Sequence, residues 1–172
     1  MIYMKPVKTI FDTVKVYKLK SRTDNRGPMT YVYEEGIEGF EPKETRIYDM
    51  PKKGTFFGIH YREENEPMKK FVTVVKGSGM DFVIDLRKDS KTYLKWEAIE
   101  LTADNALAVL IPEGIGHAFI SLEENTIQAF TIDKTGADGH SRQLNYKEEK
   151  IGLELPVPVS EISDYDEGAP FL

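Results

Sequence analysis

The chain has 172 residues, a mass of 19.7 kDa and a formal net charge of −6, so its length suits one domain and its acidity argues against a general nucleic-acid partner. It has no cysteine, which excludes disulfides, thiolate nucleophiles and cysteine-ligated metal sites. No apolar run is long enough for a membrane span and the first residues lack a signal-peptide core, so we expect a cytoplasmic protein that contacts no membrane.

The N-terminal part of the chain contains two candidate strands, at residues 14–19 and 29–34. Residues 21–28 between them are rich in turn-forming types and are expected to be a link. Both candidate strands carry apolar residues on both faces, among them Val14 and Met29, which one small barrel would leave partly exposed. We therefore expect a homodimer.

A third candidate strand covers residues 55–61. Because side chains alternate across a strand, Phe56, Gly58 and His60 are expected on one face, with the intervening residues on the other. A histidine on the inner wall of a barrel beside a glycine has room for a ligand, although a hydrogen-bonded core histidine fits the same pattern.

The central part of the chain contains two apolar runs, residues 71–75 and 80–86, joined by a short glycine-containing link at residues 76–79. This arrangement is typical of a β-hairpin. Four further strands are predicted at residues 92–101, 107–111, 117–122 and 126–132.

Short strands at roughly ten-residue spacing, separated by turn signals, predict an all-β sandwich or barrel. The tail from Gly152 contains three prolines, which suit extended segments that wrap a body. Residues 147–150 are the one place where a helical turn is expected. No repeat, linker or biased segment divides the chain, so we expect one domain over residues 1–172.

Three histidines, His60, His117 and His140, are the candidate ligands or bases. A metal-binding barrel of this type needs clustered histidines, but Arg62 stands two residues after His60, so we expect neither a metal nor another cofactor. His117 follows a turn, and the pattern leaves it between a structural role and a ligand contact. His140 is expected to be a loop residue.

Asp81 and Asp85 fall on the same face of one predicted strand. They could be paired catalytic carboxylates. Acids at such positions more often satisfy neighbouring strands or a nearby arginine such as Arg87. The pair Lys69–Lys70, just before an apolar strand, has the ordinary pattern of a solvated strand end.

Several segments, taken together and in order, resemble the dTDP-4-dehydrorhamnose 3,5-epimerase family. The most specific is IPEGIGHAF at residues 111–119, and the others are residues 24–27, 58–61, 70–77, 81–87, 95–96, 101–105 and 162–166. The resemblance covers roughly residues 14–172. It implies an all-β cupin-type jelly-roll barrel with extended N- and C-terminal segments, which is metal-independent, usually dimeric and acts on nucleotide-linked 4-keto sugars.

The resemblance also implies roles for individual residues. His60 matches the base that removes a proton next to the ketone, and Asp166 matches the carboxylate that fixes its tautomer. Lys70 matches the lysine that stabilises the enolate oxygen. Arg26 matches an arginine that holds the nucleotide phosphate, and His117 matches a histidine beside the ligand.

The chain departs from the family pattern at several positions. Phe130 stands where the family has its catalytic tyrosine, and Phe57 stands where it has a substrate-binding arginine. The family's glutamine falls near Thr45, and a pair of tyrosines falls near residues 135–136. The base, the carboxylate and the lysine therefore remain, whereas the acid and part of the nucleotide contacts are missing.

These features favour an epimerase or isomerase of nucleotide-linked 4-keto sugars, in deoxysugar and cell-surface polysaccharide biosynthesis. Water, Tyr31 or Tyr48 would then supply the proton that Phe130 cannot donate, and Phe130 and Tyr48 are expected to contact the substrate. A sugar-nucleotide 3,4-ketoisomerase is an alternative, since it needs no opposed acid. A non-catalytic sugar-nucleotide or carbohydrate-binding cupin is another, although the survival of the base and its carboxylate argues against it.

Overall fold

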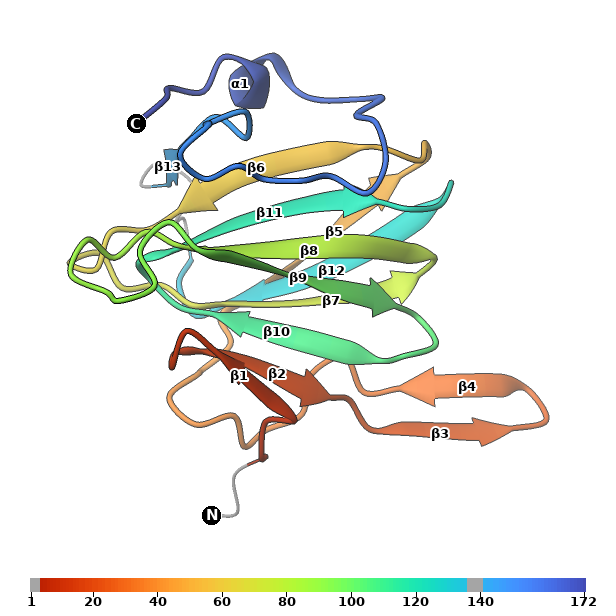
Figure 1. Cartoon of the computed structure of the whole chain (residues 1–172). Helices are drawn as coiled ribbons and strands as arrows, with labels where there is room; N and C mark the ends of the chain where they lie inside the picture. The colour runs from red at the N-terminus through yellow and green to blue at the C-terminus, as the bar shows by residue number, and fades with distance from the viewer. Residues whose placement is uncertain (1–3, 136–140) are drawn as a thin grey trace.

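Two antiparallel sheets form most of the molecule in the computed structural model, which describes residues 4–135 and 141–172 (Figure 1). The six-stranded sheet has the order β1 (Lys8–Ile10), β2 (Val14–Lys18), β10 (Leu107–Ile111), β7 (Lys70–Lys76), β12 (Thr126–Ile132) and β5 (Glu44–Met50). The five-stranded sheet has the order β13 (Arg142–Gln143), β6 (Phe56–Tyr61), β11 (Ile115–Ser121), β8 (Ser78–Asp85) and β9 (Trp96–Thr102). The all-β expectation is confirmed. Among the described residues, no helix is both long and apolar enough to cross a membrane.

Three apolar layers hold the sheets together. The central layer lies between the sheets and contains inward side chains of both, such as Val72, Val83 and Phe119. The outer face of the six-stranded sheet is covered by the loop that carries Ile37 and Phe40. β11 belongs to the five-stranded sheet, which is covered on both faces, and this explains why all seven of its residues are buried.

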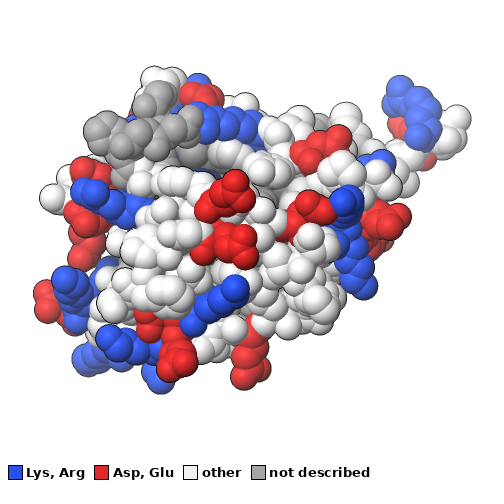
Figure 2. Space-filling model, turned by 90° about the horizontal axis from the view of Figure 1, so that it is seen from above, with Lys and Arg blue, Asp and Glu red and all other residues white. Residues whose placement is uncertain are grey.

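The outer face of the five-stranded sheet is covered by the C-terminal segment, drawn in blue across β6 and β11 in Figure 1. Leu144 and Ile151 are buried there, and the partly buried residues of the same layer include Leu153, Leu155, Val157, Val159 and Ile162. The expectation of an extended tail that wraps the body is confirmed. Seen from that side, most of the surface is uncharged, with acidic side chains near its centre and charged groups of both signs around its edge (Figure 2).

The predicted hairpin of residues 71–75 and 80–86 is wrong. The two runs form strands β7 and β8, but β7 pairs with β10 and β12, whereas β8 pairs with β11 and β9. Gly77, the residue between them, has φ +73°, and a Cβ there would lie 2.6 Å from Oγ1 of Thr126. The link therefore carries the chain from one sheet to the other, a difference that alternation within each strand does not encode.

The predicted link at residues 21–28 is also wrong, because most of it forms a β-hairpin. Strands β3 (Ser21–Asp24) and β4 (Gly27–Thr30) pair with each other alone and project from the body (Figures 1 and 2). Its residues are mostly exposed and polar, so the hairpin lacks the buried face that makes a strand visible in a sequence.

The helical turn expected at residues 147–150 is not a helix. Turns occupy this stretch, and the backbone N–H groups of Lys150 and Leu172 donate to the Glu148 carboxylate. The one helix of the described residues, α1, covers Asp164–Glu167 instead. Ser163 caps it, with its side-chain oxygen accepting from the backbone N–H of Asp166.

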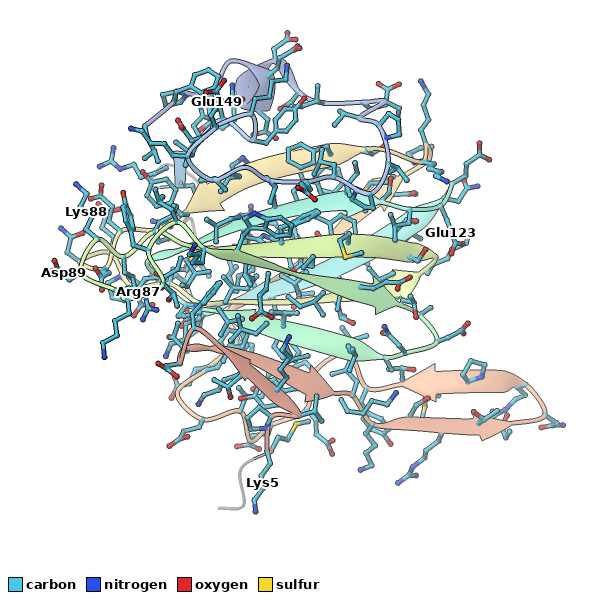
Figure 3. All side chains as sticks on the ribbon, in the orientation of Figure 1. Lys5, Arg87, Lys88, Asp89, Glu123 and Glu149 are labelled. Atoms are coloured by element: carbon cyan, nitrogen blue, oxygen red, sulfur yellow. The ribbon has the colours of Figure 1, made fainter. Side chains whose placement is uncertain are left out.

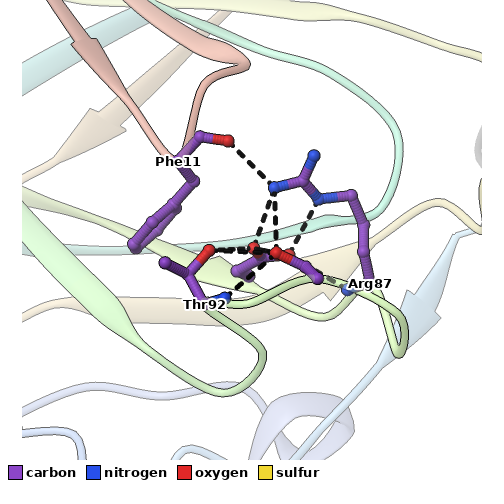
Figure 4. A network of polar contacts seen from close by, with 5 residues as sticks. Phe11, Arg87 and Thr92 are labelled. Atoms are coloured by element: carbon purple, nitrogen blue, oxygen red, sulfur yellow. Dashed lines mark hydrogen bonds and ion pairs between the residues drawn. The ribbon is translucent and has the colours of Figure 1, made fainter.

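A polar network fixes the loop after β8, at the end of the molecule where Arg87, Lys88 and Asp89 gather (Figures 3 and 4). Arg87 donates to both oxygens of the buried Asp85 carboxylate, at 2.9 and 2.8 Å, and to the Phe11 carbonyl oxygen at 2.9 Å. Burial raises the pKa of Asp85, but the hydrogen bonds from Arg87, Ser90 and Thr92 outweigh it, and the net shift is strongly downward. Asp85 is thus a structural anion.

Candidate active site

A cavity of about 340 Å³ lies between the two sheets, which is large enough for a small ligand. Strands β5 and β12 form one wall and β6 with the C-terminal segment forms the facing wall. The lining residues are Arg46, Tyr48, Phe57, His60, Met68, Lys70, Gln128, Phe130, Ile132, Ser141, Ser163, Tyr165 and Asp166. Most of the residues that the sequence singled out therefore meet in one place.

His60 and Asp166 form a short hydrogen-bonded pair at the edge of this cavity. The distance from His60 Nε2 to Asp166 Oδ1 is 2.6 Å, and the other carboxylate oxygen accepts from the backbone N–H of Gly58 at 3.2 Å. The carboxylate is almost fully buried, while the imidazole is 28% exposed. Since an ionised carboxylate only accepts hydrogen bonds, this contact assigns the donor role to Nε2 and leaves Nδ1 as the ring nitrogen that can accept a proton.

A bulge in β6 turns His60 toward the cavity. Register partners are His60 with His117 and Phe57 with Phe119, so two residues of β6 face one residue of β11. Gly58, inside the bulge, has φ +114°, and a Cβ there would lie 2.5 Å from the His117 carbonyl oxygen. The bulge requires a residue without a side chain at this position.

Because of this bulge, the face predicted for part of β6 is wrong. His60 lies inward as expected, but it shares the cavity with Phe57 and not with Phe56. Phe56 and Ile59 pack beneath the C-terminal segment. Simple alternation fails here because the extra residue shifts the pattern by one.

Lys70 lines the cavity, so it does not have the solvated position that a strand-end pattern suggests. Its ammonium nitrogen lies 5.0 Å from the centre of the Phe130 ring, within cation–π range. The neighbouring Lys69 differs, because its ammonium donates to the Gly39 carbonyl oxygen at 2.6 Å. A cation is therefore held inside the cavity on the wall that faces His60.

His117 lies next to the site and is hydrogen-bonded to Asp81. The distance from His117 Nε2 to Asp81 Oδ1 is 2.6 Å, and both side chains are buried. A smaller space of about 30 Å³ is lined by His60, Lys70 and His117. Burial lowers the pKa of His117, and the attraction of Asp81 offsets only part of that shift. Asp81 and Asp85 are thus not paired with each other.

Aromatic rings form much of the remaining wall. The rings of Tyr48 and Phe57 stack with centroids 5.0 Å apart, and Phe57 stacks on Phe119 at 5.5 Å. Tyr48 belongs to the sheet opposite His60, as does Phe130. Tyr165 follows a different course, because it lies beside Asp166 on α1, with its ring centroid 6.1 Å from that of His60. Two phenols therefore border the cavity from different sides.

Arg26 and Tyr31 do not line the cavity of their own chain. Arg26 lies at the tip of the β3–β4 hairpin, where its side chain is 85% exposed and forms an ion pair with Asp24 at 2.5 Å. The Lys20 ammonium lies 4.9 Å from the centre of the Tyr31 ring, near the base of the hairpin. His140, expected in a loop, lies outside the described residues, as does Gly136.

Sequence reasoning missed several lining residues, notably Arg46, Gln128 and Tyr165. Period-two spacing could have found the first two, because Arg46 precedes Tyr48 by two residues and Gln128 precedes Phe130 by two. The residue expected to replace the family's glutamine, Thr45, bonds to Thr131 at 2.9 Å and does not line the cavity.

No group of three or more histidine, aspartate and glutamate side chains is placed to hold a metal ion in the part of the chain that the structure describes. The two histidines near the cavity are each bonded to a different carboxylate.

Comparisons with known proteins agree on one family. The sequence model described as dTDP-4-dehydrorhamnose 3,5-epimerase matches residues 8–172. An enzyme of that name from Methanothermobacter thermautotrophicus is 28% identical over 155 residues, which cover 88% of this chain and 83% of the relative. A dTDP-4-dehydro-6-deoxyglucose 3-epimerase from Streptomyces bikiniensis is 31% identical over 121 residues, which cover 70% and 62% of the two chains.

A solved structure gives the same result. The dTDP-4-dehydrorhamnose 3,5-epimerase of Bacillus anthracis, crystallised with TDP and PPi bound, is 27% identical and superposes with a TM-score of 0.88 over 98% of this chain and 99% of that one. The resemblance inferred from the sequence and the expected cupin-type jelly roll are both confirmed.

The pKa of His117 makes a prediction about stability. Because burial lowers that pKa, the His117 side chain binds more protons in the unfolded chain than in the folded protein below about pH 6.5. We expect the free energy of unfolding to decrease on acidification from about pH 7 to about pH 5, by up to about 1.4 kcal/mol per pH unit from this group.

Urea unfolding across that pH range checks this expectation. The variant His117→Gln keeps an N–H donor for Asp81 but cannot titrate, so its stability should decrease less steeply than that of the wild-type protein. Equal slopes for the two proteins would contradict the assignment.

Proposed function

The chain belongs to the dTDP-4-dehydrorhamnose 3,5-epimerase family, a family of sugar-nucleotide epimerases, and we propose that it inverts a carbon next to the ketone of a nucleotide-linked 4-keto sugar. The observation that carries the proposal is the His60–Asp166 pair, which borders a cavity that also holds Lys70. A base, its orienting carboxylate and a cation are the groups that enolisation needs.

In the proposed mechanism, Nδ1 of His60 removes the proton from the carbon next to the ketone. The electron pair of that C–H bond moves into the carbon framework, and the ketone oxygen becomes an enolate. Lys70 stabilises the negative charge on this oxygen. Asp166 is a positioning residue, because it holds the tautomer of His60 and favours the imidazolium that forms.

Inversion then requires a proton from the opposite face of the sugar. Phe130 cannot donate one, but Tyr48 lies on the wall that faces His60, whereas Tyr165 comes from the helix that carries Asp166. We assign the donor role to Tyr48, either directly or through a water molecule. Tyr31 is less suited, because it does not line this cavity.

The nucleotide portion requires cations, and two arginines could provide them. Arg46 lines the cavity and is partly exposed. Arg26 would serve a second copy of the chain, since its hairpin projects away from the body (Figure 2). Met29 on that hairpin is 54% exposed and Ile47 on β5 is 68% exposed, which supports an apolar contact in a homodimer.

The relatives' names support a place in deoxysugar biosynthesis, and we extend this to cell-surface polysaccharides made from cytoplasmic nucleotide sugars.

One observation favours a second candidate function. With phenylalanine at position 130, a one-face proton shuttle would suit a 3,4-ketoisomerase. Proton NMR of a 4-keto sugar nucleotide in heavy water separates these readings by which carbon loses its proton, and a binding protein would exchange none.

The variant His60→Asn tests the base. We expect proton exchange at the carbon next to the ketone of dTDP-4-keto-6-deoxyglucose to slow by about 10²- to 10⁴-fold, because general-base catalysis contributes that much. The affinity for dTDP and the urea midpoint should change little, since the side chain is partly exposed. Exchange at the wild-type rate would exclude His60 as the base.

A second prediction concerns the proton donor. The variant Tyr48→Phe should lower the number of inversions per exchange event, and Phe130→Tyr in the same chain should restore it by supplying a phenol on the same wall. A phenol buried there without a partner would cost about 1–3 kcal/mol of stability, so the urea midpoint is measured alongside. An unchanged ratio in both variants would show that neither position delivers the proton.

The homodimer makes a third prediction. Arg26→Ala and His60→Asn should each be nearly inactive, but a mixture that exchanges subunits should recover about a quarter of wild-type activity, because half of the dimers then contain one intact site. Sedimentation should show a dimer at micromolar concentration. A monomer, or a mixture without recovery, would contradict the shared site.

A further inference from the structure

Gln128 is a polar side chain in an unusual environment. It belongs to β12, lines the cavity and has 0% of its surface exposed. Neither Oε1 nor Nε2 has a hydrogen-bond partner among the residues that the structure describes. Buried amides are nearly always bonded, because an unsatisfied donor or acceptor opposes folding. An amide that the protein itself leaves unsatisfied, at the wall of a ligand cavity, calls for a partner from outside the chain.

The surroundings indicate which chemical group that partner carries. Gln128 lies opposite Tyr48 in the register and two residues before Phe130 on the same face of β12. The rings of Tyr48, Phe57 and Phe130 make this part of the wall apolar. A charged phosphate would be drawn to the cavity's cations, Arg46 and Lys70. The uncharged carboxamide instead suits a neutral group that both donates and accepts, and a hydroxyl does so.

Distance along the strand indicates which part of the ligand carries that hydroxyl. Two residues of a strand span about 7 Å, and the Phe130 ring is the one that faces the Lys70 ammonium. If Lys70 holds the ketone oxygen, Gln128 is within reach of another substituent of the same sugar ring. Neither amide atom is exposed, so a neighbouring side chain must shift as the sugar enters. Tyr48, its 46% exposed register partner, is the candidate for that movement.

We propose that Gln128 determines sugar specificity by hydrogen bonding to a hydroxyl of the nucleotide-linked sugar. The inference rests on the proposed function in taking that ligand class. It adds a contact that neither the base nor the phosphate-binding arginines provide. The residue would lower the stability of the free protein and raise its affinity for a sugar that carries the matching hydroxyl.

The variant Gln128→Leu tests the proposal, since leucine has a similar size and no polar atom. Calorimetric titration with dTDP-glucose and with dTDP separates the sugar contact from the nucleotide contacts. We expect the affinity for dTDP-glucose to fall roughly 10- to 100-fold, with the affinity for dTDP unchanged. The Tm of the ligand-free variant should rise by about 2–4 °C, because an unsatisfied amide is removed.

Thr131→Val is the matched control. Thr131 lies on the same strand, outside the cavity lining, and its hydroxyl bonds to Thr45 at 2.9 Å. Its variant should bind both ligands as the wild-type protein does, with a lower Tm. Three results for Gln128→Leu would overturn the inference but not the proposed function. They are an equal loss of affinity for both ligands, no loss for either, and a lower Tm. A wild-type protein that binds neither ligand would overturn the proposed function together with it.

Discussion

The burial of the outer face of the five-stranded sheet is the interaction on which the site depends. That face is apolar, and the C-terminal segment is the layer that removes it from water. Each large side chain buried there contributes about 1.5–3 kcal/mol. The same segment ends in α1, whose cap at Ser163 directs Asp166 toward His60. The packing that stabilises the sheet therefore also delivers the carboxylate of the candidate base.

The bulge at Gly58 completes this arrangement from the other side. It turns His60 into the cavity and points the Gly58 N–H at the second oxygen of Asp166. A side chain at position 58 would collide with the backbone of β11. The orientation of the imidazole therefore depends on two distant parts of the chain, the bulge at Gly58 and the segment that carries Asp166, which this one carboxylate connects.

The strands that alternation predicts best are those whose pattern is not interrupted. The predictions of residues 107–111 and 126–132 agree with β10 and β12 to the residue. Alternation cannot reveal to which sheet a strand belongs, so the supposed hairpin around Gly77 is really a crossing between sheets. It also cannot reveal an inserted residue, so the face of Phe56 was predicted wrongly. Both errors concern relations between strands, which a local pattern does not contain.

The candidate site likewise depends on relations between distant residues that a local pattern does not contain. Asp166 lies 106 residues from His60 in sequence, and only the family resemblance brought the two together before the structure did. Gln128 carries no titratable group, and neither the strand pattern nor the family resemblance marks it as a site residue. Its unsatisfied amide becomes visible only when every neighbour is known, because satisfaction of a hydrogen bond is a property of the packed molecule.

The two walls of the cavity divide the chemistry between them. One wall supplies His60 and Asp166, and the facing wall supplies Lys70 over the ring of Phe130. A phenylalanine at that position keeps an aromatic face for the lysine cation but removes a hydroxyl. In the proposed mechanism, the groups for proton removal and enolate stabilisation therefore stay in place, while delivery of the returning proton would come from another position. In that mechanism, the departure at Phe130 would change the outcome of the reaction more than its first step, and the stereochemistry of the product is the property expected to depend on the aromatic wall.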